Sequence, residues 1–490
     1  MENQQLDDYF GYTEAGSSLQ GEMRAGLTTF MTMAYILFVN PDMLASTGIP
    51  FDDALFATAM AAFVGCVIMG LWANQPYALA PGMGLNAFFA FTVAASPDWG
   101  GMGIAWEVAL AAVLVEGVLF MIISLPQVGW RTKMINAIPR DLKIATMAGI
   151  GMFLAIIGFR EMGWVADDGA TLVTMNTPGM WGHTSGEFWA LIGLTAIAVM
   201  MARGVKGAII YGVAGITVVS WVLAAMGHDV VDTYNFDPFA NDGAGQIAYA
   251  AAPEAWFGFV GLPEESMGAA VGALGDIGSD GGTTLGAFLL VMITFLFVDI
   301  FDTAGTLYGV GKMAGKVNED DEIEAGDEAF MADAGATIVG ALCGTSTTTT
   351  YIESAAGIEE GGKTGLTAVV VGVLMLTGLF LAGIFKAIPA FAAAPALVVV
   401  GAMMMKGAAE IDWNDKEMAI PAFITIAMMP FTYSIANGIA WGVITYVLIK
   451  MAMQKWEDLN PILYTVAGLM IMFYLGPYDQ TTFEWLLDFL

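Results

Sequence analysis

The chain has 490 residues, of which 57% are hydrophobic and only 13% are charged. Soluble domains carry about 25% charged residues, so this composition excludes an ordinary soluble protein and indicates a chain that crosses a membrane many times. The net charge is −31, from 47 acidic and 16 basic residues. Most of the acids lie in connecting segments, which we interpret as an acid-coated surface adapted to high salt. We expect no nucleic-acid partner.

The predicted elements begin with a polar tail. The first twenty residues are polar, which is not the pattern of a cleaved signal peptide. We therefore expect residues 1–26 to form a cytoplasmic N-terminal tail. The first apolar segment, from about Leu27, would insert uncleaved.

Apolar segments long enough to cross a bilayer then follow one another along the chain. A spanning helix needs about 20 apolar residues. Two candidates, 77–95 and 345–362, are interrupted by proline, glycine and hydroxyl residues. The uninterrupted candidates are 27–40, 54–73, 104–125, 143–160, 188–202, 208–226, 284–310, 330–343, 366–385, 394–406, 418–434 and 436–453. Together they predict fourteen spans, and the role of the short segment 462–475 stays open.

The basic residues predict the orientation. Arg24 and the bases that follow the even-numbered spans would lie on one side, and only Arg160 and Lys386 on the other. Because Lys and Arg are enriched in cytoplasmic segments, we expect a multi-pass protein of the plasma membrane with its N-terminus inside. The segment 227–283 would then be external.

The two interrupted segments occupy matching places in the chain. One is the third span, and the other is the third span counted from the eighth. Each repeat would have seven spans. Because seven is an odd number, the second half of the chain would be inverted in the membrane relative to the first. Paired discontinuous spans in two halves are the best sequence indication of a transporter's site. We therefore predict an all-α polytopic membrane protein, with fourteen spans in two inverted seven-span repeats and spans 3 and 10 broken.

Six hydroxyl side chains follow one another at residues 345–350, in the second broken span. Ser and Thr favour bonds to nearby backbone, and β-branched Thr favours extended chain. We expect these hydroxyls to bond to the extended backbone of a short strand near 346–350. A half-helix would start at Tyr351 or Ile352, and its counterpart in span 3 at about Leu85. Their N-termini would favour polar or anionic groups.

Charge inside a span is costly and usually functional, and four acidic residues in predicted spans are singled out as candidates. We interpret Glu353 as a ligand or proton site, with helix capping as the alternative. Asp302 is also interpreted as functional. Asp299, three residues earlier on nearly the same helix face, would bind directly, support Asp302 or pack against a hydroxyl. Glu116 is more typical of a structural hydrogen bond between helices.

Asn86 follows the break of span 3, where binding and capping are both open. Two carboxylates near the midplane suit a neutral planar heterocycle, because each can accept two adjacent N–H groups. A buried carboxylate can also carry a proton with the substrate. Sodium would need several oxygen ligands together, which the sequence leaves open.

Five stretches are similar to a single family: "TTFMTMAYILFVNPDML" (28–44), "ALAPGMGLNAFFAFTV" (78–93), "LFVDIFDTAGTLYGVG" (296–311), "GTSTTTTYIESAAGI" (344–358) and "MMPFTYSIANGIAWG" (428–442). They resemble the AzgA-like guanine/hypoxanthine/adenine permeases of the nucleobase–ascorbate transporter superfamily, also called xanthine/uracil permeases. The similarity runs from about residue 20 to 455.

The resemblance implies a core domain of spans 1–4 and 8–11 and a gate domain of spans 5–7 and 12–14. It also implies proton-coupled transport and a homodimer formed through the gate domain. The implied segments are core 27–125, gate 126–226, an external loop 227–283, core 284–385, gate 386–455 and a C-terminal apolar segment 456–490 of open role.

The resemblance also places the substrate-binding residues of the family at Asp302, Glu353, Asn86, Ser354 and Thr32. In other branches a His or Asp often stands at the position of Thr306. The residue that carries the proton therefore stays open among Asp299, Asp302 and Glu353.

These observations predict a secondary active transporter in the lipid bilayer that imports hypoxanthine, guanine and adenine with a proton by alternating access. The alternative is a xanthine/uracil, other small-molecule or anion transporter of the same fold, sodium-coupled or not. An anion carrier should place Lys or Arg near the broken spans, and 284–311 and 344–362 contain neither. The only histidines, His183 and His228, lie in predicted loops. We expect no enzyme, metal or cofactor.

Overall fold

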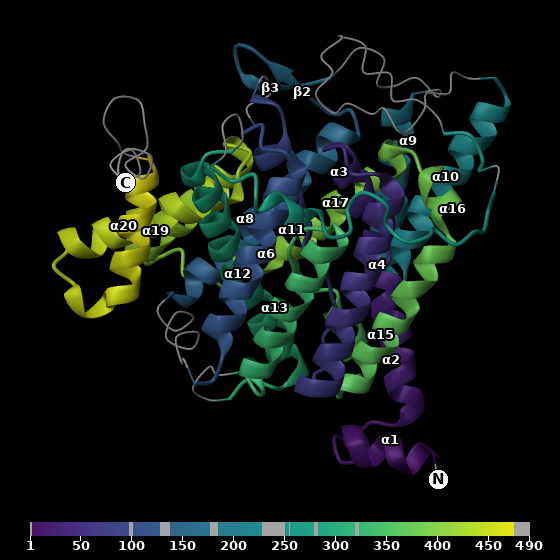
Figure 1. Ribbon diagram of the computed structural model, residues 1–490, viewed down its shortest axis with the longest axis horizontal. Helices are drawn as coiled ribbons and strands as arrows, with labels where there is room; N and C mark the ends of the chain where they lie inside the picture. Colours follow the sequence, from purple (N-terminus) through teal and green to yellow (C-terminus); the bar gives the residue numbers. More distant parts are fainter. Residues whose placement is uncertain are drawn as a thin grey trace.

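The computed structural model describes residues 2–97, 101–127, 138–176, 185–227, 250–253, 255–278, 283–318 and 323–474. The chain is mainly helical (Figure 1). Figure 1 shows the N-terminus and α1 (Glu2–Phe10) at one end of the helix bundle, and the hairpin of β2 (Val165–Asp168) and β3 (Leu172–Met175) at the other. We call these the α1 end and the β2–β3 end.

Within these ranges, seven helices have at least 18 residues and are apolar enough to cross a membrane. They are Phe51–Ala73, Trp106–Ser124, Arg140–Glu161, Ala208–Ala225, Leu285–Ala314, Ala390–Glu410 and Ile435–Ala452. Shorter apolar helices accompany them at Met83–Ala94, Gly186–Ala202, Gly365–Phe380 and Leu463–Met472. A polytopic membrane fold is therefore confirmed, whereas the fourteen spans and the inverted repeat stay predictions.

The long helices pack in two groups. The first group contains α2 (Leu19–Met33), α3 (Ile36–Ala45), α4 (Phe51–Ile68), α6 (Trp106–Ser124), α12 (Leu285–Ala314), α13 (Gly326–Cys343) and α15 (Gly365–Met375). The second group contains α8 (Arg140–Glu161), α9 (Gly186–Ala202), α10 (Ala208–Ala225), α17 (Ala390–Met404), α18 (Lys416–Phe431) and α19 (Ile435–Ala452). The groups meet mainly where α8 packs against α12.

Small residues allow close helix crossings, as is typical inside membranes. At the crossing of α8 and α17, a Cβ added to Gly151 would lie 2.5 Å from the carbonyl oxygen of Gly401. No larger residue fits there without moving one of the two helices. The second group is therefore held together by backbone approach as well as by side chains.

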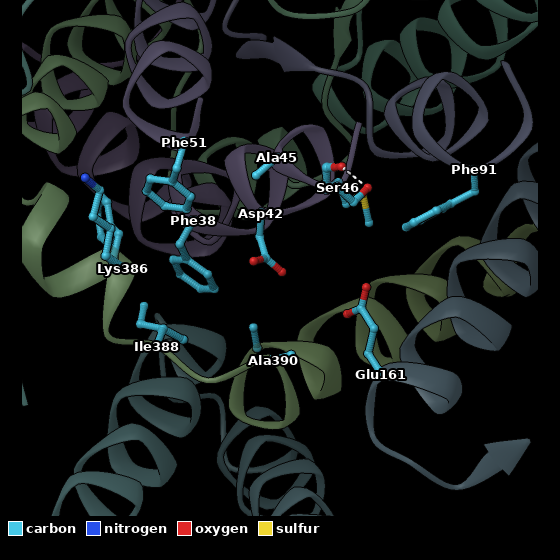
Figure 2. A pocket seen from close by; sticks show the side chains of 13 residues that line it. Phe38, Asp42, Ala45, Ser46, Phe51, Phe91, Glu161, Lys386, Ile388 and Ala390 are labelled. Atoms are coloured by element: carbon cyan, nitrogen blue, oxygen red, sulfur yellow. Dashed lines mark hydrogen bonds between the residues drawn. The ribbon is translucent and has the colours of Figure 1, made fainter. Parts of the chain in front are cut away.

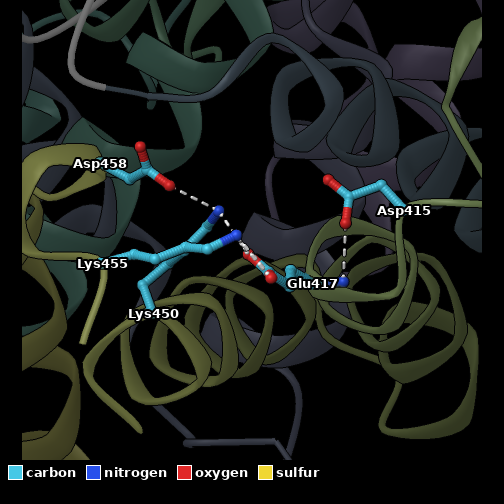
Figure 3. A network of polar contacts seen from close by, with 5 residues as sticks. All are labelled: Asp415, Glu417, Lys450, Lys455 and Asp458. Atoms are coloured by element: carbon cyan, nitrogen blue, oxygen red, sulfur yellow. Dashed lines mark hydrogen bonds and ion pairs between the residues drawn. The ribbon is translucent and has the colours of Figure 1, made fainter. Parts of the chain in front are cut away.

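An ion-pair network joins α18 and α19 at one end of their hairpin (Figure 3). Lys450 Nζ lies 2.9 Å from Glu417 Oε2 and 2.7 Å from Asp458 Oδ2. Lys455 Nζ lies 2.7 Å from Glu417 Oε1, and Asp415 accepts the Glu417 N–H at 3.0 Å to cap α18. The network links the start of α18 to the end of α19 and to the 3₁₀ turn η7 (Trp456–Asp458) that follows it.

Two other predicted spans, each expected to be a single helix, are divided into shorter helices. The segment 27–40 divides into α2 and α3 because Leu37 and Phe38 make tight i→i+3 bonds to Ala34 and Tyr35 at the junction. The segment 366–385 divides into α15, a 3₁₀ turn η5 (Leu376–Phe380) and α16 (Ala382–Lys386). There the carbonyl of Phe380 accepts the N–H of Gly258, so this backbone is bonded outside the helix.

The described part of the short segment 462–475, residues 462–474, lies in a helix, α20 (Pro461–Tyr474), that packs against α19. Its Tyr474 ring lies 5.1 Å from that of Trp441. In the predicted external segment, the described part contains the short helix α11 (Ala269–Ala273), which packs on α6 and α13. His183 and His228 lie outside the described residues.

The two interrupted segments form the strands β1 (Leu79–Pro81) and β4 (Thr348–Thr350), each followed by a short helix. The strand predicted near 346–350 is confirmed, and so are the half-helices. One of them, α5 (Met83–Ala87), starts two residues earlier than expected, and the other, α14 (Ser354–Glu359), starts slightly later. The sequence did not predict that the two strands pair with each other.

Candidate functional site

The broken spans meet in a buried antiparallel strand pair. Leu79 pairs with Thr350 and Pro81 with Thr348. The Gly82 N–H donates to the Thr347 carbonyl at 2.9 Å and continues the ladder beyond the strands. Irregular backbone at membrane depth needs such internal partners, since lipid offers none. Each broken span therefore satisfies the backbone of the other.

The hydroxyl run has a different role from the predicted one. The Thr350 hydroxyl donates to Asp333 Oδ1 at 3.0 Å, across to α13. The hydroxyl of Thr337, also on α13, lies 3.1 Å from both the N–H and the carbonyl oxygen of Thr348. The expectation that the run bonds to its own backbone is wrong at these positions. Strand pairing and α13 already supply that backbone with partners, so the hydroxyls can link β4 to other elements.

Glu353 lies at the N-cap position of α14, but its side chain makes no capping bond, so the capping interpretation is wrong. Its carboxylate is 2% exposed and accepts a hydrogen bond of 2.8 Å from the Tyr35 hydroxyl. Tyr35 lies at the junction of α2 and α3. The junction between α2 and α3 therefore places the Tyr35 hydroxyl against Glu353, which lies in the second interrupted segment.

Thr32, near the end of α2, lies beside the backbone of Glu353. Its hydroxyl is 3.5 Å from the Glu353 carbonyl oxygen and 2.8 Å from the Thr29 carbonyl oxygen of its own helix. The shorter bond is the better one, because N–H or O–H bonds weaken beyond about 3.2 Å. The Thr32 hydroxyl is thus mainly occupied within α2.

Asp302 lies on α12 and is 7% exposed. Within the described residues, its Oδ1 has no hydrogen-bond partner. The Thr349 side chain of β4 and the Glu353 carboxylate both act on it electrostatically. One turn later, a Cβ added to Gly305 would lie 2.8 Å from Cγ of Met147, so glycine brings α8 close to this point. The structure therefore brings Asp302 and Glu353 together where the two helix groups meet.

Asn86 lies on α5 and is fully buried. Its Oδ1 contacts the Ser346 hydroxyl, and its Nδ2 has no partner within the described residues. Gly82 is the N-cap of α5, so Asn86 does not cap that helix. Buried polar groups without partners are rare and costly, so the unpaired Asn86 amide and the unpaired Asp302 oxygen are both candidate ligand contacts.

Ser354 has a structural contact instead. Its Oγ accepts the N–H of Ala78 at 2.9 Å, immediately before β1. The Tyr351 hydroxyl similarly donates to the Pro81 carbonyl at 2.6 Å. These two bonds attach the start of α14 to the other broken span. Because Tyr351 and Ser354 flank Glu353 in the chain, the bonds also fix the position of Glu353.

A cavity of about 950 Å³ opens between α8, α12 and α14. Gly305, one turn after Asp302, and Ile352, next to Glu353, both line it. Arg140 and Lys143 line it at the start of α8. Pockets for small molecules have volumes of about 300–1,000 Å³. The cavity is therefore large enough for a small molecule to pass through it to the broken spans.

The model of the Permease family, Xan_ur_permease, matches residues 20–441. The chain belongs to this family. The guanine/hypoxanthine permease PbuO of Bacillus subtilis is 38% identical over 469 residues, which cover 94% of this chain and 99% of that protein. The adenine permease AdeP of Escherichia coli K12 is 34% identical over 467 residues, 95% of each chain. These permeases confirm the resemblance and the expectation that the chain is not an enzyme.

The fold is shared with more distant proteins. The transmembrane domain of the cyanobacterial bicarbonate transporter BicA superposes with a TM-score of 0.54 and 16% identity, covering 89% of this chain and 97% of that domain. The similarity shows the fold alone. Together with the family and the apolar helices, it identifies a multi-pass membrane protein.

A second buried cluster in this permease was only partly predicted. Thr303 Oγ lies 2.6 Å from Asp333 Oδ2 and 3.2 Å from Asp299 Oδ1, and Glu116 faces Asp299. The three acids are fully buried. Sequence reasoning missed Asp333, although the rule used for Asp302 applies to it, because it too is an acid inside a predicted span. Within the described part of the chain, no group of three or more His, Cys, Asp or Glu is placed to hold a metal ion.

Proposed function

We propose that this permease carries purine nucleobases and binds them between Asp302, Glu353 and Asn86. The observation that carries the proposal is the pair of unpaired groups at the broken spans, the Asp302 Oδ1 acceptor and the Asn86 Nδ2 donor. Guanine, hypoxanthine and adenine are the compounds named for the similar permeases.

The chemistry of the three side chains matches the edge of a purine. Ring N–H and exocyclic amino groups donate, and carboxylates accept such bonds strongly because the bond is charge-assisted. Ring nitrogens and carbonyl oxygens accept, which suits the Asn86 amide. Tyr35 holds the Glu353 carboxylate in place, so the site is largely formed before the purine binds.

The two helix groups support alternating access as the proposed transport mechanism. We assign the first group as the core domain and the second as the gate domain, with the purine bound at their boundary. Basic residues line the cavity at the α1 end, so we assign that end to the cytoplasm and this structure to an inward-facing state. A proton on Asp299, Asp302 or Glu353 would accompany the purine into the cell. The plasma-membrane location, the homodimer and the choice of proton over sodium belong to the same proposal.

Uptake into proteoliposomes tests this function. Radiolabelled hypoxanthine, adenine, guanine, xanthine and uracil would be offered with an imposed pH gradient, with and without Na⁺. We expect saturable accumulation of at least one of the first three bases that collapses with the proton gradient. Accumulation of only xanthine or uracil, or none at all by correctly folded protein, would contradict the purine assignment. Dependence on Na⁺ alone would contradict proton coupling.

A further inference from the structure

A second, smaller pocket lies at the opposite end of α8 from the large cavity (Figure 2). Arg140, at the start of α8, lines the cavity, and Glu161, at its end, lines the pocket. At 1.5 Å per residue these positions are about 32 Å apart along the helix axis. The pocket lies between α3 of the first group and α8 and α17 of the second. It therefore marks the boundary of the groups at the β2–β3 end.

Two carboxylates face each other across this boundary. Figure 2 shows Asp42 of α3 and Glu161 of α8 pointing into the same space. Glu161 is only 8% exposed, and the two carboxylates repel each other. Within the described residues, neither side chain has a hydrogen bond or an ion pair. Glu161 is thus a buried, unpartnered charge aimed into a cavity.

The nearby basic groups are turned to other acids. Lys386 also lines the pocket, but its Nζ lies 2.6 Å from Asp52 Oδ2. Arg160 attracts its neighbour Glu161 electrostatically, yet its guanidinium lies 3.4 Å from Asp167 Oδ2 and over the Tyr433 ring. Figure 2 shows the Lys386 ammonium pointing away from Asp42 and Glu161.

The surroundings make an uncompensated pair of charges costly. Phe38, Phe51 and Phe91 line the pocket and offer no hydrogen bonds. Two carboxylates that share an apolar site cannot both be ionised cheaply unless a positive charge joins them. The pocket volume of about 50 Å³ exceeds the roughly 10–15 Å³ that one water needs. A proton, or a small metal ion with a water, therefore fits.

We propose that this pocket binds one small monovalent cation between Asp42 and Glu161, and that the cation holds the two helix groups together at the β2–β3 end. When the cation leaves, repulsion between the carboxylates separates the groups and opens this entrance. Proton and sodium ion share the required chemistry, a single positive charge. The inference rests on the alternating access of the proposed function, and not on which molecule is carried.

Distances between spin labels test the inference. Val271 on α11 belongs with the first group and is 52% exposed, and Val222 on α10 belongs to the second and is 53% exposed. Both would be changed to cysteine and labelled after removal of the two native cysteines. In an otherwise unchanged chain we expect the short distance at pH 5, or at pH 9 with Na⁺, and a shift to a longer distance at pH 9 without Na⁺.

This experiment distinguishes a proton from a sodium ion as the bound cation. A distance that depends on pH but not on Na⁺ identifies a proton, and one that Na⁺ restores at pH 9 identifies a metal ion. Asp42→Asn and Glu161→Gln, made singly, remove the repulsion and should keep the short distance under all conditions. Glu187→Gln is the matched control, because Glu187 is a buried acid on α9 that does not line the pocket, and it should respond as the unchanged chain does.

Two results would overturn the inference. One is a distance in the unchanged chain that responds to neither pH nor Na⁺. The other is a response of Asp42→Asn or Glu161→Gln equal to that of Glu187→Gln. No purine is needed for the measurement, so a clear response from a protein that takes up no nucleobase would support this cation site and contradict only the proposed substrate.

Discussion

Two buried acids, Asp302 on α12 and Asp333 on α13, differ in their hydrogen bonding. Asp333 in the cluster with Asp299 has hydroxyl partners at both oxygens, at 2.6 and 3.0 Å. Asp302 faces the boundary between the helix groups and keeps an oxygen without a partner. A saturated acid stabilises one conformation, whereas an unsaturated acid at a moving boundary can bind something. Within the described residues, Asp299 Oδ2 and both Glu116 oxygens also lack hydrogen-bond partners, so the contrast holds between Asp302 and Asp333. We therefore expect changes at the hydroxyl partners of Asp333 to affect stability and changes around Asp302 to affect binding.

The largest effect should follow from Glu353→Ala. The change removes a carboxylate from the proposed site and leaves the buried Tyr35 hydroxyl without its partner. Hydrogen bonds to charged groups contribute about 1.5–3 kcal/mol, so purine Kd should rise about 10- to 100-fold. Binding of radiolabelled purine to purified protein measures this. Glu353→Gln is the control, because its amide oxygen can still accept from Tyr35, and it should bind more tightly than the alanine variant but lose proton coupling.

Unchanged purine affinity in Glu353→Ala would remove this residue from the site. The difference between Asp302 and Asp333 would then have no functional meaning, and the purine would have to bind elsewhere along the cavity.

A smaller effect should come from Gly357→Ala in α14. A Cβ there would lie 2.8 Å from the Ala25 carbonyl oxygen of α2, so the half-helix must shift and move Glu353 with it. Overpacking of this kind costs about 1–3 kcal/mol, and we expect purine affinity to fall about tenfold. Gly309→Ala is the matched control, since its added Cβ would meet nothing closer than 3.6 Å. Equal affinities of the two variants would show that the position of α14 does not determine binding.

Much of this site could be predicted from the sequence. Proline, glycine and hydroxyl residues inside apolar segments predicted both broken spans, and acids at membrane depth predicted Asp302 and Glu353. The pairing of β1 with β4 could not be predicted, because contacts between residues about 270 apart depend on how the halves pack. Tyr35 was missed for the same reason, since an apolar stretch with one tyrosine does not indicate that it contacts Glu353.

The opposite behaviour is expected of Thr303→Val, which removes one of the hydroxyl partners of Asp333. The change keeps the shape of the side chain but removes the hydroxyl that lies between Asp299 and Asp333. Buried groups left without partners cost about 1–3 kcal/mol, so thermal unfolding in detergent should occur at lower temperature. Purine affinity of the folded fraction should change less than threefold. A large loss of affinity with unchanged thermal stability would show that this cluster takes part in binding.

The smallest effect should come from Thr32→Val, at the position where the family resemblance and the geometry differ. The resemblance places Thr32 among the binding residues, but its hydroxyl bonds to the Thr29 carbonyl at 2.8 Å. That carbonyl can keep its helical bond, and valine matches threonine in shape, so we expect less than a twofold change in purine Kd. Thr32→Ala removes both the methyl group and the hydroxyl, so comparing it with Thr32→Val separates the effects of the two groups. A tenfold loss in Thr32→Val alone would mean that the hydroxyl leaves Thr29 to meet the purine, and would extend the unsaturated region from α12 to α2.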